Sequence, residues 1–394
     1  MSNRNMHSTH SIELAEVGME EALWALNNNV LSLNNQVDPA AWVATGWVLT
    51  GSTQSKTITG FGYENGAAGQ VDITVESYAT TPRITVVGKT TLGDHSTITR
   101  TLQSDTQRSP LFTNAIGAVG NLTFNFAGTV DSYTASDALN PATYAYGFSA
   151  VVSGANVDLG NSSVYGYATT KGTTLQNLSG AKLAGSLAAT GIDAARLSTN
   201  GSQPLFDSIE PSIGGGSGPI TSSTTFATAG AYRLDSIDLP DGEVITISAP
   251  VMLKVSNSVR TSGSGSIVIT NTGSLELQID ENDGFGLVLD GAGIVNQSRL
   301  PRNLSVLIGG NYLGNPISSI NVTNDFYGSI YLPRDDLTIA SNSPIFGALI
   351  AKSVTFTASA PQFHYDPGLQ NFSVAEIKAP IALVQLRELS PTGL

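Results

Sequence analysis

The feature that most constrains this fold is a short pattern in which an aromatic residue is followed by glycine. It occurs three times, at residues 162–168 (SSVYGYA), 325–331 (DFYGSIY) and 343–350 (SPIFGALI). Each copy has a short apolar, β-type stretch beside it, at residues 157–159, 337–339 and 354–356. A repeat of roughly 17–20 residues is too short for a globular unit and is about the length of one solenoid coil. The pattern therefore predicts stacked β coils, which favour architecture or surface display over catalysis.

Composition limits the class of protein and its partners. The 394 residues are enough for two or three domains. Charged residues make up only 12% and glycine is abundant at 41 residues, a profile typical of extracellular, turn-rich β-proteins. A net charge of −13 repels nucleic acid and anionic lipid, so neither is an expected partner. The chain has no cysteine, which excludes disulfides and cysteine-ligated zinc.

Residues 11–33 predict one amphipathic helix. Its apolar side chains recur at spacings of three and four residues and are Ile12, Ala15, Met19, Ala22, Leu23, Leu26, Val30 and Leu33. Glu13, Glu16 and Glu20 take the other face. After Pro39 the pattern changes to period two, at residues 71–75, 84–86 and 97–102, and this predicts three or four antiparallel strands packed with the helix.

The rest of the chain alternates short strand patterns with turn residues. Residues 199–225 are rich in Gly, Ser and Pro and indicate a flexible linker or large loop. Because the aromatic-Gly pattern occurs on both sides of this loop, we expect one right-handed β-helix (β-solenoid) domain with an insertion. The expected organisation is a helix-and-sheet domain at 1–110, the β-solenoid at 111–373, and a tail at 374–394 that caps the exposed solenoid end.

Several stretches resemble one family. Residues 14–23 (LAEVGMEEAL) resemble the segment that follows the membrane-spanning part of the N-terminal helix in type IV pilus assembly proteins of the PilX kind. The strands at 71–75, 84–88 and 97–102 resemble the small sheet that such pilin-like proteins pack on this helix. Residues 111–133 and 326–369 resemble the start and end of an uncharacterised domain often attached to these N-termini.

The resemblance implies a protein of the pilus or pseudopilus without known catalysis, at the cell envelope or extracellular surface of a bacterium. Its implied partners are other pilin-like subunits or the pilus assembly machinery, with surface glycans as a second candidate. The predicted contact is packing of the helix against partner helices through Ile12, Ala15, Met19, Leu23 and Leu26; the alternative is that the chain's own sheet buries this face. The leader and the hydrophobic half-helix of pilins do not occur in this sequence. We therefore expect membrane attachment only through a missing N-terminal segment.

The most distinctive candidate for chemistry is His364-Tyr365-Asp366. A histidine beside a carboxylate can act as a base or a metal ligand. The alternative, which we favour, is that these residues form a structural motif that ties off the last coil through buried hydrogen bonds, because neither a second histidine nor a nucleophile motif lies nearby in sequence.

The acidic residues offer weaker candidates. Asp280 and Asp283 resemble a fragment of a Ca²⁺ loop but lack the EF-hand spacing, and a solvated turn is the alternative; we expect no other cofactor. Asp235, Asp238 and Asp241 could line a solenoid face, as paired carboxylates do in glycosidases, or could be turn residues.

The sequence contains no GxSxG, HExxH, P-loop or dinucleotide fingerprint. The leading hypothesis is accordingly a non-enzymatic structural or adhesive cell-surface protein that displays its β domain for surface or subunit binding. The alternative is a secreted β-helix protein that binds carbohydrate or acts on it as a polysaccharide lyase or glycosidase.

Overall fold

The computed structural model describes residues 3–28, 39–77, 82–108, 112–134, 149–172, 180–199, 216–281, 284–309, 317–371 and 381–389. It divides the chain into two compact units. Unit 1 comprises Met1–Ser109 and Ser373–Leu394, and unit 2 is Pro110–Phe372. Within the described residues, no helix is both long and apolar enough to cross a membrane.

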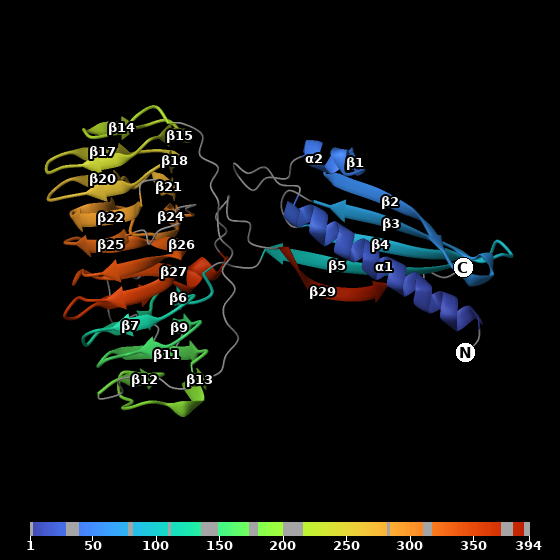
Figure 1. Ribbon diagram of the computed structural model, residues 1–394, viewed down its shortest axis with the longest axis horizontal. Coiled ribbons are helices and arrows are strands. Elements are labelled where there is room, and N and C mark those ends of the chain that lie inside the picture. Colours follow the sequence, from blue (N-terminus) through green and yellow to red (C-terminus); the bar gives the residue numbers. More distant parts are fainter. Residues whose placement is uncertain are drawn as a thin grey trace. The chain divides into compact units, whose positions relative to one another are not determined.

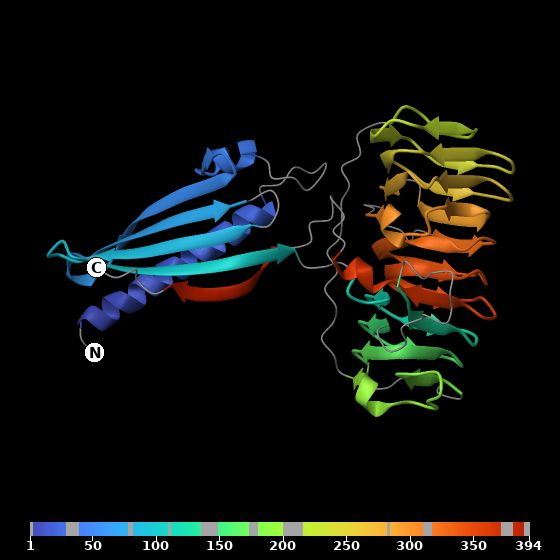
Figure 2. The same cartoon turned by 180° about the vertical axis from the view of Figure 1, so that it is seen from behind.

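Unit 1 is one long helix on an antiparallel sheet. The helix α1 (Asn3–Asn28) lies along one face of the sheet (Figures 1 and 2), and a short helix α2 (Pro39–Ala44) follows. The sheet has six strands in the order β1 (Val48–Thr50), β2 (Thr53–Gly62), β3 (Ala68–Glu76), β4 (Arg83–Thr91), β5 (Thr97–Arg108) and β29 (Ile381–Leu389). β3 and β4 alternate buried and half-buried residues, so one sheet face packs on the helix. The expected N-terminal helix on an antiparallel sheet is confirmed, and Val30 and Leu33 lie outside the described residues.

The C-terminal tail adds the last strand to this sheet. β29 pairs antiparallel with β5, from Ile381 opposite Arg108 to Leu389 opposite Thr101, with an irregularity between Leu383 and Gln385. The structure therefore places this part of the tail in unit 1, whereas a cap would belong to the end of unit 2. A pairing between segments so far apart in sequence has no local signal.

Residues 224–322 of unit 2 contain three series of parallel strands, stacked as Figure 1 shows. One series is β14 (Thr224–Phe226), β17 (Val244–Ile247), β20 (Ser266–Ile269) and β23 (Gly293–Asn296). The second is β15 (Gly230–Leu234), β18 (Pro250–Val255), β21 (Ser274–Ile279) and β24 (Leu304–Ile308). The third is β16 (Ile237–Leu239), β19 (Val259–Thr261), β22 (Phe285–Gly291) and β25 (Ile317–Val322). Of the predicted linker, residues 200–215 lie outside the described part.

The other strands of unit 2 join the two ends of its sequence. They are β6 (Ile116–Ala118), β7 (Leu122–Phe124), β8 (Thr129–Ser132), β9 (Ser149–Ser153), β10 (Val157–Asp158), β11 (Ser163–Thr170), β12 (Lys182–Ala184), β13 (Leu197–Thr199), β26 (Phe326–Ile339), β27 (Ile345–Phe356) and β28 (Gln362–Tyr365). Late strands pair in parallel with early ones: β27 pairs with β6 and β7, and β28 with β8. Short 3₁₀ turns lie at Glu64–Gly66, Ala194–Arg196, Pro301–Asn303 and Pro367–Asn371.

These pairings correct the expected fold of the second domain. Parallel contacts run from β6 to β9, β11, β8, β28 and β27 and back to β6, so six parallel strands form a closed barrel. The prediction of a right-handed β-helix, or β-solenoid, is therefore wrong. The physical reason is that a period-two pattern specifies strands and their buried faces but not their pairing partners.

The aromatic-Gly pattern marks strand register. β26 and β27 pair so that Tyr327 faces Phe346 and Gly328 faces Gly347. The two aromatic rings stack with centroids 4.5 Å apart. Gly347 has φ of 143°, and a Cβ there would lie 1.8 Å from the Gly328 carbonyl oxygen, so only glycine fits beside the stacked rings.

Candidate functional site

The helix α1 is fixed closely on its sheet. Its buried stripe packs into a core with strand residues such as Val71 and Val86, and consists of Leu14, Ala15, Met19, Ala22, Ala25 and Leu26. Gly88 of β4 allows a backbone approach, because a Cβ there would lie 2.0 Å from the Ser11 carbonyl oxygen. Ser11 Oγ also lies 2.9 Å from Thr90 Oγ1 and donates to the Ile98 carbonyl at 3.0 Å. The position of α1 is thus set by both apolar and polar contacts.

The five residues predicted to pack against partner helices fall into two groups by burial. Ala15, Met19 and Leu26 are buried in the core of unit 1, which is the alternative in which the chain's own sheet takes this face. Ile12 and Leu23 are half-buried, and Leu23 packs against the same core. Of the five predicted residues, only Ile12 and Leu23 leave part of their side-chain surface exposed to solvent.

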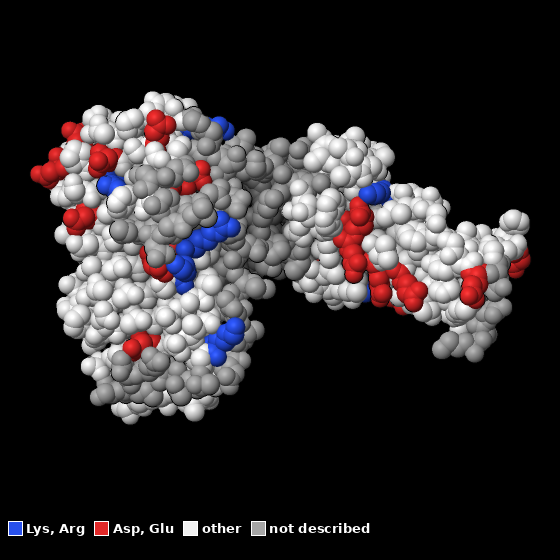
Figure 3. Space-filling view, in the orientation of Figure 1, with Lys and Arg blue, Asp and Glu red and all other residues white. Residues whose placement is uncertain are grey.

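The outward face of α1 combines acidic and apolar side chains, and sequence reasoning missed its apolar part. Val17 is 43% exposed and Trp24 is 50% exposed. Glu13, Glu16 and Glu20 are exposed beside them, and acidic side chains gather along this side of unit 1 (Figure 3). Large apolar side chains at the centre of an otherwise polar helix face indicate a contact surface. The available signal was the position of Val17 and Trp24 among the glutamates.

His364, Tyr365 and Asp366 make separate structural hydrogen bonds. His364 Nδ1 lies 2.5 Å from Asp131 Oδ1, and both side chains are buried where β28 pairs with β8. The Tyr365 hydroxyl donates to the Phe112 carbonyl at 2.7 Å. Asp366 Oδ1 accepts from the Gly368 backbone N–H at 2.9 Å, and burial raises the pKa of the Asp366 carboxyl. The three side chains thus bond to three different partners, at Asp131, Phe112 and Gly368.

Of the other acidic candidates, Asp235 and Asp241 are hydrogen-bonded within the fold, whereas Asp238 is exposed in β16. Asp241 Oδ1 accepts from the Ser264 hydroxyl at 2.6 Å, and Asp235 Oδ1 accepts from the Gly216 backbone N–H at 3.1 Å. Asp280 follows β21, while Asp283 lies outside the described residues, so a Ca²⁺ site at this pair stays a prediction. In the part of the chain that the structure describes, no three His, Cys, Asp or Glu side chains are grouped to hold a metal.

Glu281, the residue after Asp280, and Asp335 are buried carboxyl groups that the sequence analysis did not single out. Glu281 and Asp335 are 0% and 1% exposed. Burial raises the pKa of the Asp335 carboxyl, while hydrogen bonds with Glu281 and Ser318 lower it. Burial is the largest of these effects, so the pKa of Asp335 is raised overall.

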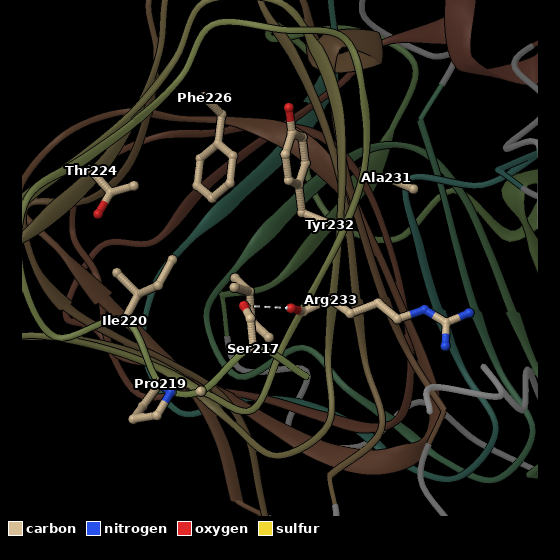
Figure 4. A pocket seen from close by; sticks show the side chains of 10 residues that line it. Ser217, Pro219, Ile220, Thr224, Phe226, Ala231, Tyr232 and Arg233 are labelled. Atoms are coloured by element: carbon tan, nitrogen blue, oxygen red, sulfur yellow. Dashed lines mark hydrogen bonds between the residues drawn. The ribbon is translucent and has the colours of Figure 1, made fainter. Parts of the chain in front are cut away.

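A pocket of about 500 Å³ opens beside β14 and β15. The rings of Phe226 and Tyr232 meet edge to face with centroids 4.8 Å apart, and Ile220 adds apolar surface. Ser217 Oγ donates to the Arg233 carbonyl at 3.1 Å, while the guanidinium of Arg233 points away from Phe226 and Ile220 (Figure 4). The lining therefore combines aromatic and aliphatic surface with polar groups, a composition found in sites for small neutral ligands.

Comparison with known proteins identifies a family model and a solved structure. The model of a domain of unknown function (DUF7305) matches residues 193–372. No curated protein matches the chain. A solved structure similar to this chain is the competence-associated pilin ComZ from Thermus thermophilus, with 11% identity, a TM-score of 0.23, and coverage of 99% of this chain and 98% of that one. At that TM-score the likeness does not define the fold of this chain.

Proposed function

We propose that this chain is a non-enzymatic structural subunit of a type IV pilus or pseudopilus, at the bacterial cell envelope. Unit 1 is the docking part, and its partners are other pilin-like subunits or the assembly machinery. Unit 2 is displayed for binding a surface or a neighbouring subunit. The observation that carries this proposal is the long helix α1, held tightly on its sheet while its outer face leaves Val17 and Trp24 open to a partner.

The chemistry of the described residues supports a structural role. His364, Tyr365, Asp241 and Asp235, which sequence reasoning singled out, are engaged in hydrogen bonds of strands and turns. The resemblance of residues 14–23 to the helix of PilX-type proteins supports the pilus assignment. A helix that is fixed on its sheet and exposes one face suits binding of a partner protein better than catalytic turnover of a substrate.

Site-specific crosslinking tests this function directly. The chain has no native cysteine, so a single Val17→Cys variant gives one reactive position on the outer face of α1. We expect the full-length protein, produced in its own host, to fractionate with the envelope and to crosslink from this position to a small number of envelope subunits. A matched Gly62→Cys variant, at the end of β2, should give none of these products. Recovery in the cytosol without crosslinks would refute the proposal.

The pocket beside β14 and β15 favours a second candidate function, binding of a neutral surface glycan. Aromatic rings that line an open pocket pack well against sugar rings, and the nearby hydroxyl groups can accept or donate hydrogen bonds. This candidate function is tested by calorimetric titration of the full chain with a panel of neutral oligosaccharides. We expect one member to bind and Tyr232→Ala to abolish that binding, with Tyr63→Ala as control. Equal binding by both variants would exclude this pocket, and appearance of new reducing ends would indicate an enzyme instead.

A further inference from the structure

The exposed stripe on α1 has the spacing of a helix-pairing seam. Glu13, Val17, Glu20 and Trp24 are separated by four, three and four residues. In an α-helix this spacing places side chains in one row, and it is the spacing through which two helices pack side by side. The row spans about 17 Å of helix, roughly three turns. Its apolar and acidic members alternate, so a matching helix would have to present apolar and oppositely charged groups in turn.

The acidic members of this face are exposed carboxylates. Among the described residues, Glu13, Glu16 and Glu20 have no ion-pair partner, whereas the neighbouring Glu21 pairs with Lys56 at 2.6 Å. The three carboxylates line up along the face that also exposes Val17 and Trp24. Their like charges lie at spacings of three, four and seven residues, which destabilises an isolated helix slightly. A cationic partner would remove this repulsion and cover the apolar side chains at once.

We propose that this stripe binds a helix that carries Lys or Arg side chains opposite Glu13 and Glu20 and apolar side chains opposite Val17 and Trp24. The same face of a second copy is a poor occupant, because it would set acid against acid, and the whole chain carries a net charge of −13. An anionic lipid surface is disfavoured for the same electrostatic reason. The occupant is therefore a different protein with a basic amphipathic helix. This inference deepens the proposed function, on which it rests, by naming the charge of the docking partner.

The protein contains its own reporter for this contact. The chain has three tryptophans. Trp42 and Trp47 are buried in the core of unit 1, at 0% and 2% exposure, whereas Trp24 is 50% exposed. Docking on the stripe would move the Trp24 indole from water into an apolar contact. The expected signal is a blue shift of its emission, which should disappear in a Trp24→Phe variant while the signal of the two buried tryptophans stays.

The experiment titrates the full chain with two synthetic helical peptides of about three heptads. One has Leu and Lys alternating along its seam, and the other has Glu in place of each Lys. We expect a saturable blue shift with the Lys peptide that weakens as salt is raised, and none with the Glu peptide. Glu13→Gln with Glu20→Gln should raise the Kd about tenfold, because two facing charge pairs are lost.

Matched controls separate this contact from general attraction to an acidic protein. The pair Glu64→Gln and Glu76→Gln removes the same charge from exposed positions off α1 and should leave the Kd unchanged. Equal weakening by both pairs, or equal binding of both peptides, would overturn the proposal. Selective peptide binding without envelope crosslinks would refute the proposed function while supporting the basic-helix specificity of the stripe. Envelope crosslinks from position 17 without selectivity for the Lys peptide would refute only the charge of the partner.

Discussion

Replacing Gly88 by alanine should displace α1 from its sheet. A Cβ at this position would lie 2.0 Å from the Ser11 carbonyl oxygen and 2.8 Å from the Ala15 backbone nitrogen. Both are backbone atoms, so rotation of a side chain cannot relieve the clash. The helix must move away locally, and the contacts of Ser11 Oγ with Thr90 and the Ile98 carbonyl should be lost with that movement.

The expected loss of stability follows from these contacts. Overpacking costs about 1–3 kcal/mol, and each of two hydrogen bonds contributes about 1 kcal/mol, so the sum is about 3–5 kcal/mol. Gly18→Ala provides a contrast within the same interface, because its added Cβ meets the Val71 and Val86 methyl groups at 2.5 Å. Side chains can adjust, and alanine favours the helix interior by about 1 kcal/mol, so the net loss should be about 0–2 kcal/mol.

Tryptophan fluorescence isolates the unfolding of unit 1, because all three tryptophans of the chain lie there. With a urea m value of about 2 kcal/mol per molar, Gly88→Ala should lower the midpoint of that transition by about 2 M. Gly62→Ala is the matched control, since a Cβ there meets nothing within 4 Å. Equal midpoints for the Gly88→Ala and Gly62→Ala variants would refute the assignment of a close helix–strand contact.

Three further changes should act on unit 2 and on its pH response. Asp131→Ala leaves the buried His364 ring without its carboxylate hydrogen-bond partner and should destabilise unit 2 by about 1–3 kcal/mol, measured by calorimetry against the exposed substitution Asp325→Ala. The pKa of Asp335 is raised above its unfolded value, so the stability from its bound proton is present in acid and is lost as the pH rises through the folded-state pKa; thermal melts should show this slope and Asp335→Asn should flatten it. The pKa of Asp366 is also raised by burial, so Asp366→Asn should remove a further part of the same slope.

The sequence predicts local elements of unit 1 well because their signals are local. Apolar spacing along residues 11–33 predicts a helix, and α1 occupies Asn3–Asn28, so it begins earlier than the pattern indicated. Period-two alternation at residues 71–75 and 84–86 predicts the strands β3 and β4. The place of β29 had no such signal, because its pairing with β5 joins residues 381–389 to residues 101–108. Strand pairing over long separations is a property of the folded chain and not of any window of residues.

The aromatic-Gly pattern shows the same division in unit 2. It correctly indicated stacked strands, since Tyr327 and Phe346 stack across β26 and β27. It did not indicate that β27 and β28 also pair with β6, β7 and β8, and the closure that follows from these pairings overturned the expected right-handed β-helix. A sequence repeat shows which side chains each strand buries. Closure of the barrel depends on which strand, distant in sequence, pairs with it.

The candidate site illustrates a limit of hydrophobic periodicity. The strongest apolar stripe of α1, including Ala15 and Met19, is the one that the protein uses for its own core. A docking face has to be tolerable in water before the partner arrives, so its apolar residues are sparse and interrupted by charges, as Val17 and Trp24 are by Glu20. The same reasoning links the two interfaces of α1: a shift of the helix caused by Gly88→Ala should change the height of the outer stripe above its sheet but not its internal spacing. Binding of a single basic helix to that stripe should therefore survive the substitution under conditions in which unit 1 stays folded.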